Sequence, residues 1–334
     1  MNMSLSNLPW LEPLVKIVRG DNVSQNATII IKTIGLPLAG ILVFLLVWHA
    51  AASNINTSLG QFPGPADVVE QSGNLLQEHI TEREKADAFY IRQEKRNAAR
   101  VKVDPDYVPK IRDYTGKPTY IDQIGTSLIT VLSGFFLASL IAVPLGIVIG
   151  LSANLYSAFN PIIQIFKPVS PLAWLPLVTM VVSALYVTDD PAVAKSFVTS
   201  MITVMLCCLW PTVINTAVGV ASISQELKNV SMVLRLNYIT HVIKIVLPAS
   251  VPMMFTGLRL SLSIAWMVLI AAEMLAQNPG LGKFVWDEFQ NGSSDSLGRI
   301  MVAVITIGII GFALDRVMLI IQRFVSWDKA ATLR

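Results

Sequence analysis

The fold is decided by the stretch Ala221–Gly257, ASISQELKNVSMVLRLNYITHVIKIVLPASVPMMFTG, which places polar residues between two long apolar segments. Its first half predicts a short helix over Gln225–Arg235. Ser222, followed three residues later by Gln225, fits a capping box at the start of that helix. Apolar residues recur on one of its faces, at Leu227, Val230 and Leu234. A helix with such a face is a shape that another protein can bind.

The second half of the stretch predicts a break and a second helix. Asn237 tolerates the left-handed backbone conformation that stops a helix, so we place the break there. Helical spacing resumes over Ile239–Val246, and Leu247-Pro248 is expected to end that helix just before the next apolar segment. The stretch should therefore form two short helices that project from an apolar region.

The composition around this stretch indicates a membrane protein. The 334 residues are 53% hydrophobic and only 14% charged, and the mean hydropathy is +0.59. Soluble domains carry about a quarter charged residues, so a disordered chain, a nucleic-acid module and an ordinary cytosolic enzyme are excluded. The net charge of +3 is too small and too dispersed to imply a nucleic-acid partner.

Six segments are long and apolar enough to cross about 30 Å of hydrocarbon. They are Thr33–Ala52, Gly125–Leu151, Val169–Val187, Phe197–Ala221, Val251–Ala276 and Ile300–Ile321. After the second, Ser152–Asn160 turns polar and Pro161 is expected to close the turn. The third carries Pro171 and Pro176, so it can also be two re-entrant pieces. The first resembles a signal peptide, but 32 residues precede its long core, so we expect an uncleaved span.

Lysine and arginine are unequally shared between the two sets of connections, and this bias sets the orientation. One set holds Lys16, Arg19, Lys167, Lys228, Arg235, Lys244, Arg323, Lys329 and Arg334. The short loops of the other set hold Lys195, Lys283 and Arg299. We therefore expect both termini and the segment 222–248 in the cytoplasm. The long insert between the first two spans is then outside, because long loops cross a membrane largely regardless of charge.

That insert concentrates the charge of the chain. Asp67–Asp122 holds 10 of the 25 basic and 11 of the 22 acidic residues. We expect a loop over Ser58–Pro65 and a helix over Asn74–Lys102, which has strong helix formers and neither Gly nor Pro. Prolines make the remainder irregular. The insert is either a docking platform for an extracytoplasmic partner or a solvated decoration resting on the membrane surface.

The opening stretch resembles the EAA loop of ABC importer permeases. Three residues keep that family's spacing: Ile245, Leu247 and Pro248. Asn229 stands in place of its Glu and Arg235 in place of its Gly, as in the nitrate and bicarbonate branch of the nitrate/sulfonate/taurine permease family. Asn237 is then expected to take the turn role of the glycine. Other strings follow the family's order: Pro168–Leu177, Thr256–Arg259, Ala265-Trp266, Ala271–Leu275, Pro279–Gly282, Trp286-Asp287 and Leu314–Arg316.

The resemblance, which covers 62–70 and 121–323, implies an all-α integral membrane protein with about six transmembrane helices. The architecture would be that of a type I ABC importer permease, or MetI-like, with an EAA coupling loop and an extra periplasmic insert. The expected organisation is a cytoplasmic segment 1–32, a first transmembrane helix 33–52, the insert 53–122, a permease core 123–323 with five transmembrane helices and the coupling loop 222–248, and a cytoplasmic tail 324–334. Such a protein lies in the bacterial inner membrane.

The resemblance also implies a division of labour. The chain would pair with a second permease copy, as a homodimer, within membrane lipid. It would receive solute from a periplasmic solute-binding protein and be driven by cytosolic ABC ATPase subunits, which hold the ATP and Mg²⁺. No cofactor and no enzyme activity are expected in this chain. In agreement, Gly282-Lys283 is followed by Phe284 and lacks the upstream glycine of a phosphate-binding loop.

The resemblance assigns contact with the ATPase to the coupling loop, at Glu226, Asn229, Val230, Arg235, Leu236, Asn237, Leu247 and Pro248. Candidates for the translocation path or its gate are Trp174, Arg259, Trp266 and Glu273. Arg259 can pair with Asp315 on the last span, or it can draw an anion through the path. Glu273 lies roughly 21 Å further along the same helix, so it cannot pair with Arg259. Glu273 would repel an anion and is expected to orient the outer gate or the binding-protein contact.

We therefore expect the permease subunit of an ATP-driven importer for a small inorganic anion, nitrate first, that works by alternating access. Bicarbonate, cyanate and an organosulfonate such as taurine are the alternatives within the family. An ion-coupled secondary transporter would need paired charges at mid-membrane and an inverted repeat. A membrane enzyme would need a nucleophile or metal cluster. The sequence shows neither pattern, and we interpret Cys207 and Cys208 as small apolar residues in a packed helix.

Overall fold

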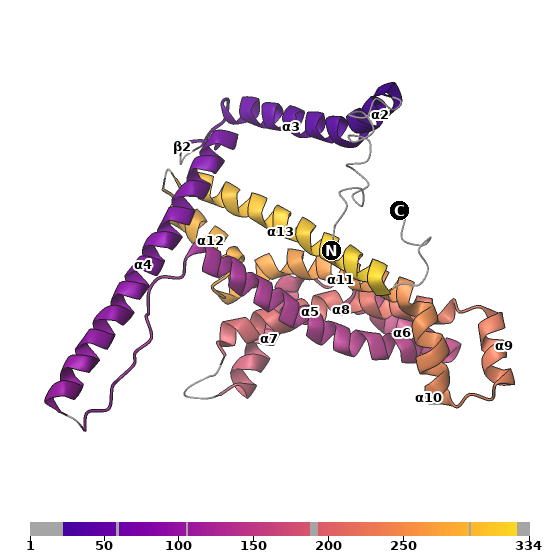
Figure 1. Cartoon of the computed structure of the whole chain (residues 1–334). Coiled ribbons are helices and arrows are strands. Elements are labelled where there is room, and N and C mark those ends of the chain that lie inside the picture. The colour runs from indigo at the N-terminus through magenta and orange to yellow at the C-terminus, as the bar shows by residue number, and fades with distance from the viewer. Residues whose placement is uncertain (1–22, 58–59, 105, 188–192, 294, 326–334) are drawn as a thin grey trace.

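The computed structural model describes residues 23–57, 60–104, 106–187, 193–293 and 295–325 (Figure 1). Most of the expected N-terminal segment 1–32 and nearly all of the tail 324–334 lie outside these residues. The described chain is helical except for connections and a small antiparallel hairpin of β1 (Asn56–Thr57) and β2 (Gly60–Gln61). Five helices are long and apolar enough to cross a membrane, or six if one bent pair is counted as a span, which agrees with the six expected segments.

The centre of the bundle is α8 (Lys195–Ala221), which packs along both α5 (Tyr120–Gly150) and α11 (Leu247–Ala276). Small residues let α5 and α8 approach closely, as is usual for helices inside a membrane. A Cβ atom at Gly146 would lie 2.6 Å from Cβ of Thr216, and one at Gly150 would lie 2.6 Å from the carbonyl oxygen of Ala217. Cys208 is fully buried here and Cys207 is partly buried, as expected for packing residues.

Shorter helices and the last span complete the bundle. α13 (Ser296–Val325) lies along α11, and α12 (Leu281–Asn291) lies at the end of the bundle where α11 finishes and α13 begins. The opposite end carries α9 (Gln225–Val233) and α10 (Tyr238–His241) (Figure 1). The coupling loop and α12 are therefore separated by the full length of the spans.

The expected third span and the connection before it form two helices. α6 (Ala153–Phe166) and α7 (Pro171–Leu185) meet at 96°. The expected polar turn over Ser152–Asn160 is wrong, because Pro161 lies inside α6 instead of closing a turn. The Ser152 hydroxyl accepts a hydrogen bond from the Leu155 amide and so caps α6, which shows that the polar residues mark a helix start.

The fifth span is longer than expected because Pro248 does not end the preceding helix. α10, the π-helical turn η3 (Val242–Val246) and α11 form one continuous run, Tyr238–Ala276, of 39 residues. A proline ring clashes with the carbonyl four residues earlier in an α-helix. Here the Leu247 amide bonds the carbonyl of Val242, five residues back, so the π turn shifts the bonding pattern just before Pro248.

The N-terminal part stands away from the bundle (Figure 1). It consists of α2 (Val23–Ile30), η2 (Ile31–Gly35) and α3 (Leu36–Ala52). Together they include the apolar run Gln25–Ala52, and no residue in the most apolar 18-residue stretch of that run is buried. α4 (Pro65–Val103) follows and is longer at both ends than the expected helix over Asn74–Lys102. Asp67 explains the early start, since its carboxylate accepts a hydrogen bond of 2.7 Å from the Gly64 amide.

Candidate functional site: a coupling loop and an outer hinge on one long helix

The coupling loop 222–248 presents α9 as a projecting amphipathic helix. Its apolar side chains are exposed at Leu227, Val230, Val233 and, just after the helix, Leu234. Val233 is exposed by 82%. Glu226 and Asn229 are exposed on the same helix, and the Gln225 side-chain amide donates to that of Asn229 at 3.2 Å. A short helix with uncovered aliphatic side chains is suited to insertion into a groove on a partner.

The coupling loop 222–248 differs from the expected structure in three ways. The capping box at Ser222 is wrong: Ser224 is the N-cap of α9, and the Ser222 hydroxyl donates to the carbonyl of Gly219 at the end of α8. Asn237 is not left-handed, because its φ is −69° and its side chain caps α10. The left-handed residue is Arg235, with φ +46°, and α9 already ends at Val233. Arg235 thus adopts the conformation for which glycine is best suited.

The loop is linked internally to the long helix. The Ser231 hydroxyl, buried on α9, lies 2.8 Å from Nδ1 of His241 on α10. Leu236 is half-buried, and its amide bonds the Ser231 carbonyl. Leu247 and Pro248 lie in the first turn of α11, directly after η3. α9 is therefore joined, through Ser231 and His241, to the helical run that begins at Tyr238.

The other end of that run is held by a buried carboxylate. Glu273 is fully buried, and its carboxylate accepts hydrogen bonds from the Ser127 hydroxyl on α5, at 2.8 and 2.9 Å, and from the Gly282 amide, at 3.0 Å. Ser127 also accepts the Leu281 amide at 2.8 Å. We call the group Ser127, Glu273 and 278–282 the outer hinge, because it joins α5, the end of α11 and the start of α12.

Close backbone approach makes the outer hinge specific for glycine. A Cβ atom at Gly282 would lie 2.2 Å from the carbonyl oxygen of Ile270, and one at Gly280 would lie 2.1 Å from the Glu273 carboxylate. Neither of these atoms can move aside easily, because the first belongs to the helix backbone and the second to a buried carboxylate that is held by hydrogen bonds. Glu273 cannot touch a docked protein itself, so any effect it has there must act through this turn.

Arg259 and Asp315 form the expected ion pair. Nε of Arg259 bonds one carboxylate oxygen of Asp315, and Nη2 bonds the other at 2.9 Å, so the contact is bidentate. The pair lines a crevice of about 180 Å³ between α11 and α13 that also includes Trp266. The indole of Trp266 donates to the carbonyl of Ile307 at 2.9 Å. Both residues therefore join α11 to α13.

Trp174 lies elsewhere, on α7. Phe166 stacks on it with ring centroids 5.9 Å apart, and on Trp210 at 6.0 Å. The two indole nitrogens are buried without a hydrogen-bond partner in the part of the chain that the structure describes. The four path or gate candidates thus fall into three places, and only Arg259 and Trp266 share one.

Sequence reasoning missed the polar partners that complete these places. Ser127 lies 146 residues from Glu273 in the sequence. Thr130 accepts a hydrogen bond of 3.2 Å from the side-chain amide of Asn278, which lies 148 residues further along the chain. A buried carboxylate on an apolar span, followed by a Pro-Gly-Leu-Gly turn, was the available clue that a partner had to exist. Among the described residues no group of three His, Cys, Asp or Glu side chains is placed to hold a metal ion.

An apolar helical bundle in which the continuous helical run Tyr238–Ala276 carries a projecting amphipathic loop has the architecture of a membrane permease subunit. Residues 142–327 match the family described as binding-protein-dependent transport system inner membrane component. The chain belongs to this family and is the permease subunit of an ABC importer. Membership implies that the chain functions together with ATPase and binding-protein subunits and that it crosses the membrane several times.

Relatives extend the likeness beyond that range. A nitrate import permease protein of Synechocystis sp. is 32% identical over 290 residues, 86% of this chain and 88% of the relative. One from Leptolyngbya laminosa is 38% identical over 193 residues, 58% of this chain and 64% of the relative. A bicarbonate transport system permease protein of Synechococcus elongatus is 33% identical over 293 residues, 87% of this chain and 88% of the relative.

A solved structure supports the MetI-like fold. A chain of the MetNI methionine ABC transporter in an inward-facing conformation superimposes with a TM-score of 0.53 at 14% identity. The match covers 62% of this chain and 95% of that chain. The expected type I importer architecture is therefore confirmed.

Proposed function

We propose that this permease imports nitrate, with bicarbonate as the second candidate. The observation that carries the proposal is the likeness to nitrate import permeases, one of which aligns over 86% of the chain at 32% identity and another over the core at 38%. Bicarbonate is kept because a bicarbonate permease aligns as fully, over 87% of the chain at 33%. Both solutes are small monovalent oxyanions with a planar centre.

The proposed assembly has two copies of the chain, ATPase subunits on the α9 side and a solute-binding protein on the α12 side. The excess of lysine and arginine in the connections near α9, such as Lys167, Lys244 and Arg323, supports a cytoplasmic position for that end and for both termini in the inner membrane. The ATP and Mg²⁺ would be held by the ATPase.

The proposed coupling runs along one helix. ATPase closure would displace α9 through its exposed aliphatic face, and the contact of Ser231 with His241 would pass the displacement to the run Tyr238–Ala276. That run of 39 residues extends roughly 58 Å at 1.5 Å per residue. Its far end is fixed to the outer hinge by Glu273. The coupling loop would therefore move the outer hinge as the transporter alternates between inward and outward access.

Arg259 is proposed to join helices instead of drawing the anion. Its guanidinium is already engaged by both oxygens of Asp315, so little of its charge is free to attract a solute. A bidentate pair between α11 and α13 would make these helices move together, so the motion of α11 would include the last span.

The test is the ATPase rate of the purified complex with its cognate solute-binding protein, loaded with nitrate, loaded with bicarbonate, or empty. Nitrate-loaded protein is expected to stimulate hydrolysis above both other states. Stimulation by bicarbonate alone would transfer the assignment to the second candidate. Equal rates in all three states would contradict import of either anion.

A further inference from the structure

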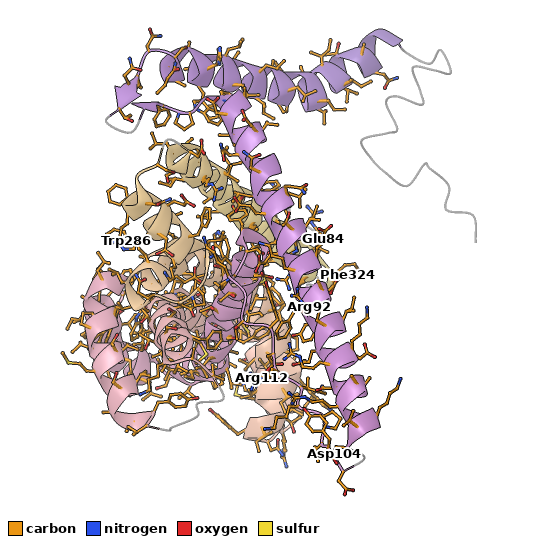
Figure 2. The ribbon with its side chains drawn as sticks, turned by 90° about the vertical axis from the view of Figure 1, so that its left-hand side faces the viewer. Glu84, Arg92, Asp104, Arg112, Trp286 and Phe324 are labelled. Carbon is orange, nitrogen blue, oxygen red and sulfur yellow. The ribbon has the colours of Figure 1, made fainter. Side chains whose placement is uncertain are left out.

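The arm, residues 65–117, is the part of the molecule that the coupling scheme does not use. It consists of α4 and a return segment after Val103 and lies outside the family-matched residues 142–327. Figure 1 shows α4 beginning beside the start of α13 and slanting away, so that its far half projects beyond the bundle. Figure 2 shows it along one edge of the bundle, with Asp104 at the far end and Glu84 nearer the core.

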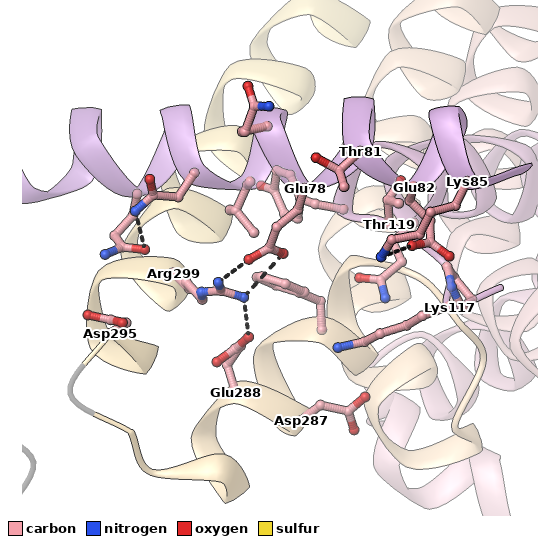
Figure 3. A pocket seen from close by; sticks show the side chains of 18 residues that line it. Glu78, Thr81, Glu82, Lys85, Lys117, Thr119, Asp287, Glu288, Asp295 and Arg299 are labelled. Carbon is pink, nitrogen blue, oxygen red and sulfur yellow. Dashed lines mark hydrogen bonds and ion pairs between the residues drawn. The ribbon is translucent and has the colours of Figure 1, made fainter. Parts of the chain in front are cut away.

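The base of the arm is fixed to the ends of the spans. The guanidinium of Arg299, in the first turns of α13, bonds Glu78 of the arm and, at 3.4 Å, Glu288 of α12 (Figure 3). His79 lies 2.6 Å from the hydroxyl of Thr119, which caps α5. α4 therefore meets α5 and α13 at the end of the bundle where these two helices begin.

The far part of the arm is ordered by its own contacts. The side-chain amide of Gln93 donates to the Arg112 carbonyl at 3.2 Å and accepts the Arg112 amide at 2.9 Å. Asn97 donates to the Lys110 carbonyl at 3.1 Å. Nearer the base, the Tyr114 hydroxyl donates to Glu82 at 2.7 Å and holds the pKa of that carboxyl below its ordinary value. The return segment is thus held on α4 as a defined surface.

The charge of the arm changes sign along its length. The near part, 65–89, has six acidic and two basic residues. The far part, 90–112, has seven basic and three acidic residues, a net charge of +4. Its basic residues are Arg92, Lys95, Arg96, Arg100, Lys102, Lys110 and Arg112. The two parts of the arm therefore carry net charges of opposite sign.

The same far part exposes aliphatic side chains. Val103, Val108 and Ile111 are exposed by 88%, 78% and 81%. An apolar groove of about 630 Å³ runs beside them between α4 and the return segment, and its lining includes Tyr90, Val101 and Ile111. Exposed aliphatics beside a cluster of lysine and arginine are typical of elements that lie in the headgroup region of an anionic bilayer.

We propose that the far part of the arm, residues 90–112, is an interfacial element that binds anionic phospholipid headgroups of the outer leaflet. The base of the arm is fixed to the ends of membrane spans, so a bilayer lies close to it, and the charge of the far part complements phosphate. The contact of Arg299 with Glu78 would then link a lipid-bound arm to α12 and α13 at the outer end.

The experiment places a spin label at Ile111→Cys in the Cys207→Ser/Cys208→Ser background of the whole complex. The complex is held in nanodiscs of phosphatidylcholine alone or with phosphatidylglycerol, and accessibility to oxygen and to a water-soluble nickel chelate is measured. With phosphatidylglycerol the label should become accessible to oxygen and severalfold less accessible to nickel. A label at Glu84→Cys, in the acidic part of the arm, is the matched control and should remain accessible to nickel in both discs.

Charge variants separate electrostatic attraction from general burial. Lys95→Glu/Arg96→Glu/Lys102→Glu should restore nickel access at position 111, whereas Lys95→Arg/Arg96→Lys/Lys102→Arg should not. If the label at position 111 stays accessible to nickel in the anionic discs when the charges of the arm are unchanged, the proposal is overturned. That result needs no charge variant. Protection that arises only when a solute-binding protein is added would also overturn it and would assign the surface to that protein.

Discussion

Removal of the Glu273 carboxylate should destabilise the outer end of the bundle more than any exposed substitution. In Glu273→Ala, the Ser127 hydroxyl and the Gly282 amide both lose their acceptor inside a buried site. An unsatisfied buried donor costs about 1–3 kcal/mol, so the two together cost about 2–6 kcal/mol. At about 1.4 °C per kcal/mol for a chain of 334 residues, the melting midpoint should fall by at least about 3 °C.

The assay uses the thiols of the chain. Cys208 is fully buried and Cys207 partly buried, so a thiol-reactive fluorophore reports the loss of helix packing as temperature rises. Glu273→Gln keeps an acceptor oxygen and should melt between Glu273→Ala and the unmodified protein. Glu84→Ala removes an exposed carboxylate on α4 and should leave the midpoint unchanged. A midpoint for Glu273→Ala equal to that of Glu84→Ala would refute the hinge.

Four further sets of substitutions test other parts of the scheme. Arg259→Met should lower the yield of folded protein more than Arg259→Met/Asp315→Leu, because the single change leaves Asp315 without a partner in a span; equal yields would contradict the pairing. Arg235→Gly should raise the melting midpoint slightly, since a left-handed residue other than glycine costs about 1 kcal/mol, and Arg235→Val should lower it. Arg235→Glu/Leu236→Glu should abolish co-purification of the ATPase while the chain still inserts in the membrane. Gly282→Ala should abolish stimulation of the ATPase by the binding protein, because its Cβ would meet the Ile270 carbonyl at 2.2 Å; retained stimulation would show that the turn does not move with α11.

The spans could be predicted because they depend on composition over many residues. An apolar run of sufficient length is a property of the local sequence, and five or six such helices were found. The Arg259–Asp315 pair was predictable for a related reason: two opposite charges at similar depth on apolar helices have few other partners.

Local stop rules failed where the backbone used an unusual conformation. Pro248 reads as a helix end, but the π turn over Val242–Val246 shifts the hydrogen bonds just before it. Arg235 reads as a helical residue and Asn237 as the left-handed one, yet Arg235 is left-handed and Asn237 is extended and caps α10. Propensities are averages over many contexts, so they do not fix the conformation of a single residue.

The outer hinge could not be predicted from spacing at all. Glu273 and Ser127 are 146 residues apart, so only the packing of α11 against α5 brings them together. The length of α4 beyond the expected bounds follows from a cap at Gly64 and Asp67, where a proline at the first helical position also favours an early start.

The central claim is that this chain carries nitrate when an ATPase and a binding protein act on it from opposite ends. The most direct measurement is uptake of isotopically labelled nitrate into proteoliposomes that contain the purified complex. ATP is enclosed inside the vesicles, where the ATPase subunits lie, and the binding protein is added outside. We predict uptake that requires both ATP and the binding protein and is lost in Glu273→Ala. Nitrate uptake without ATP, or ATP-driven uptake that excludes nitrate, would contradict the account.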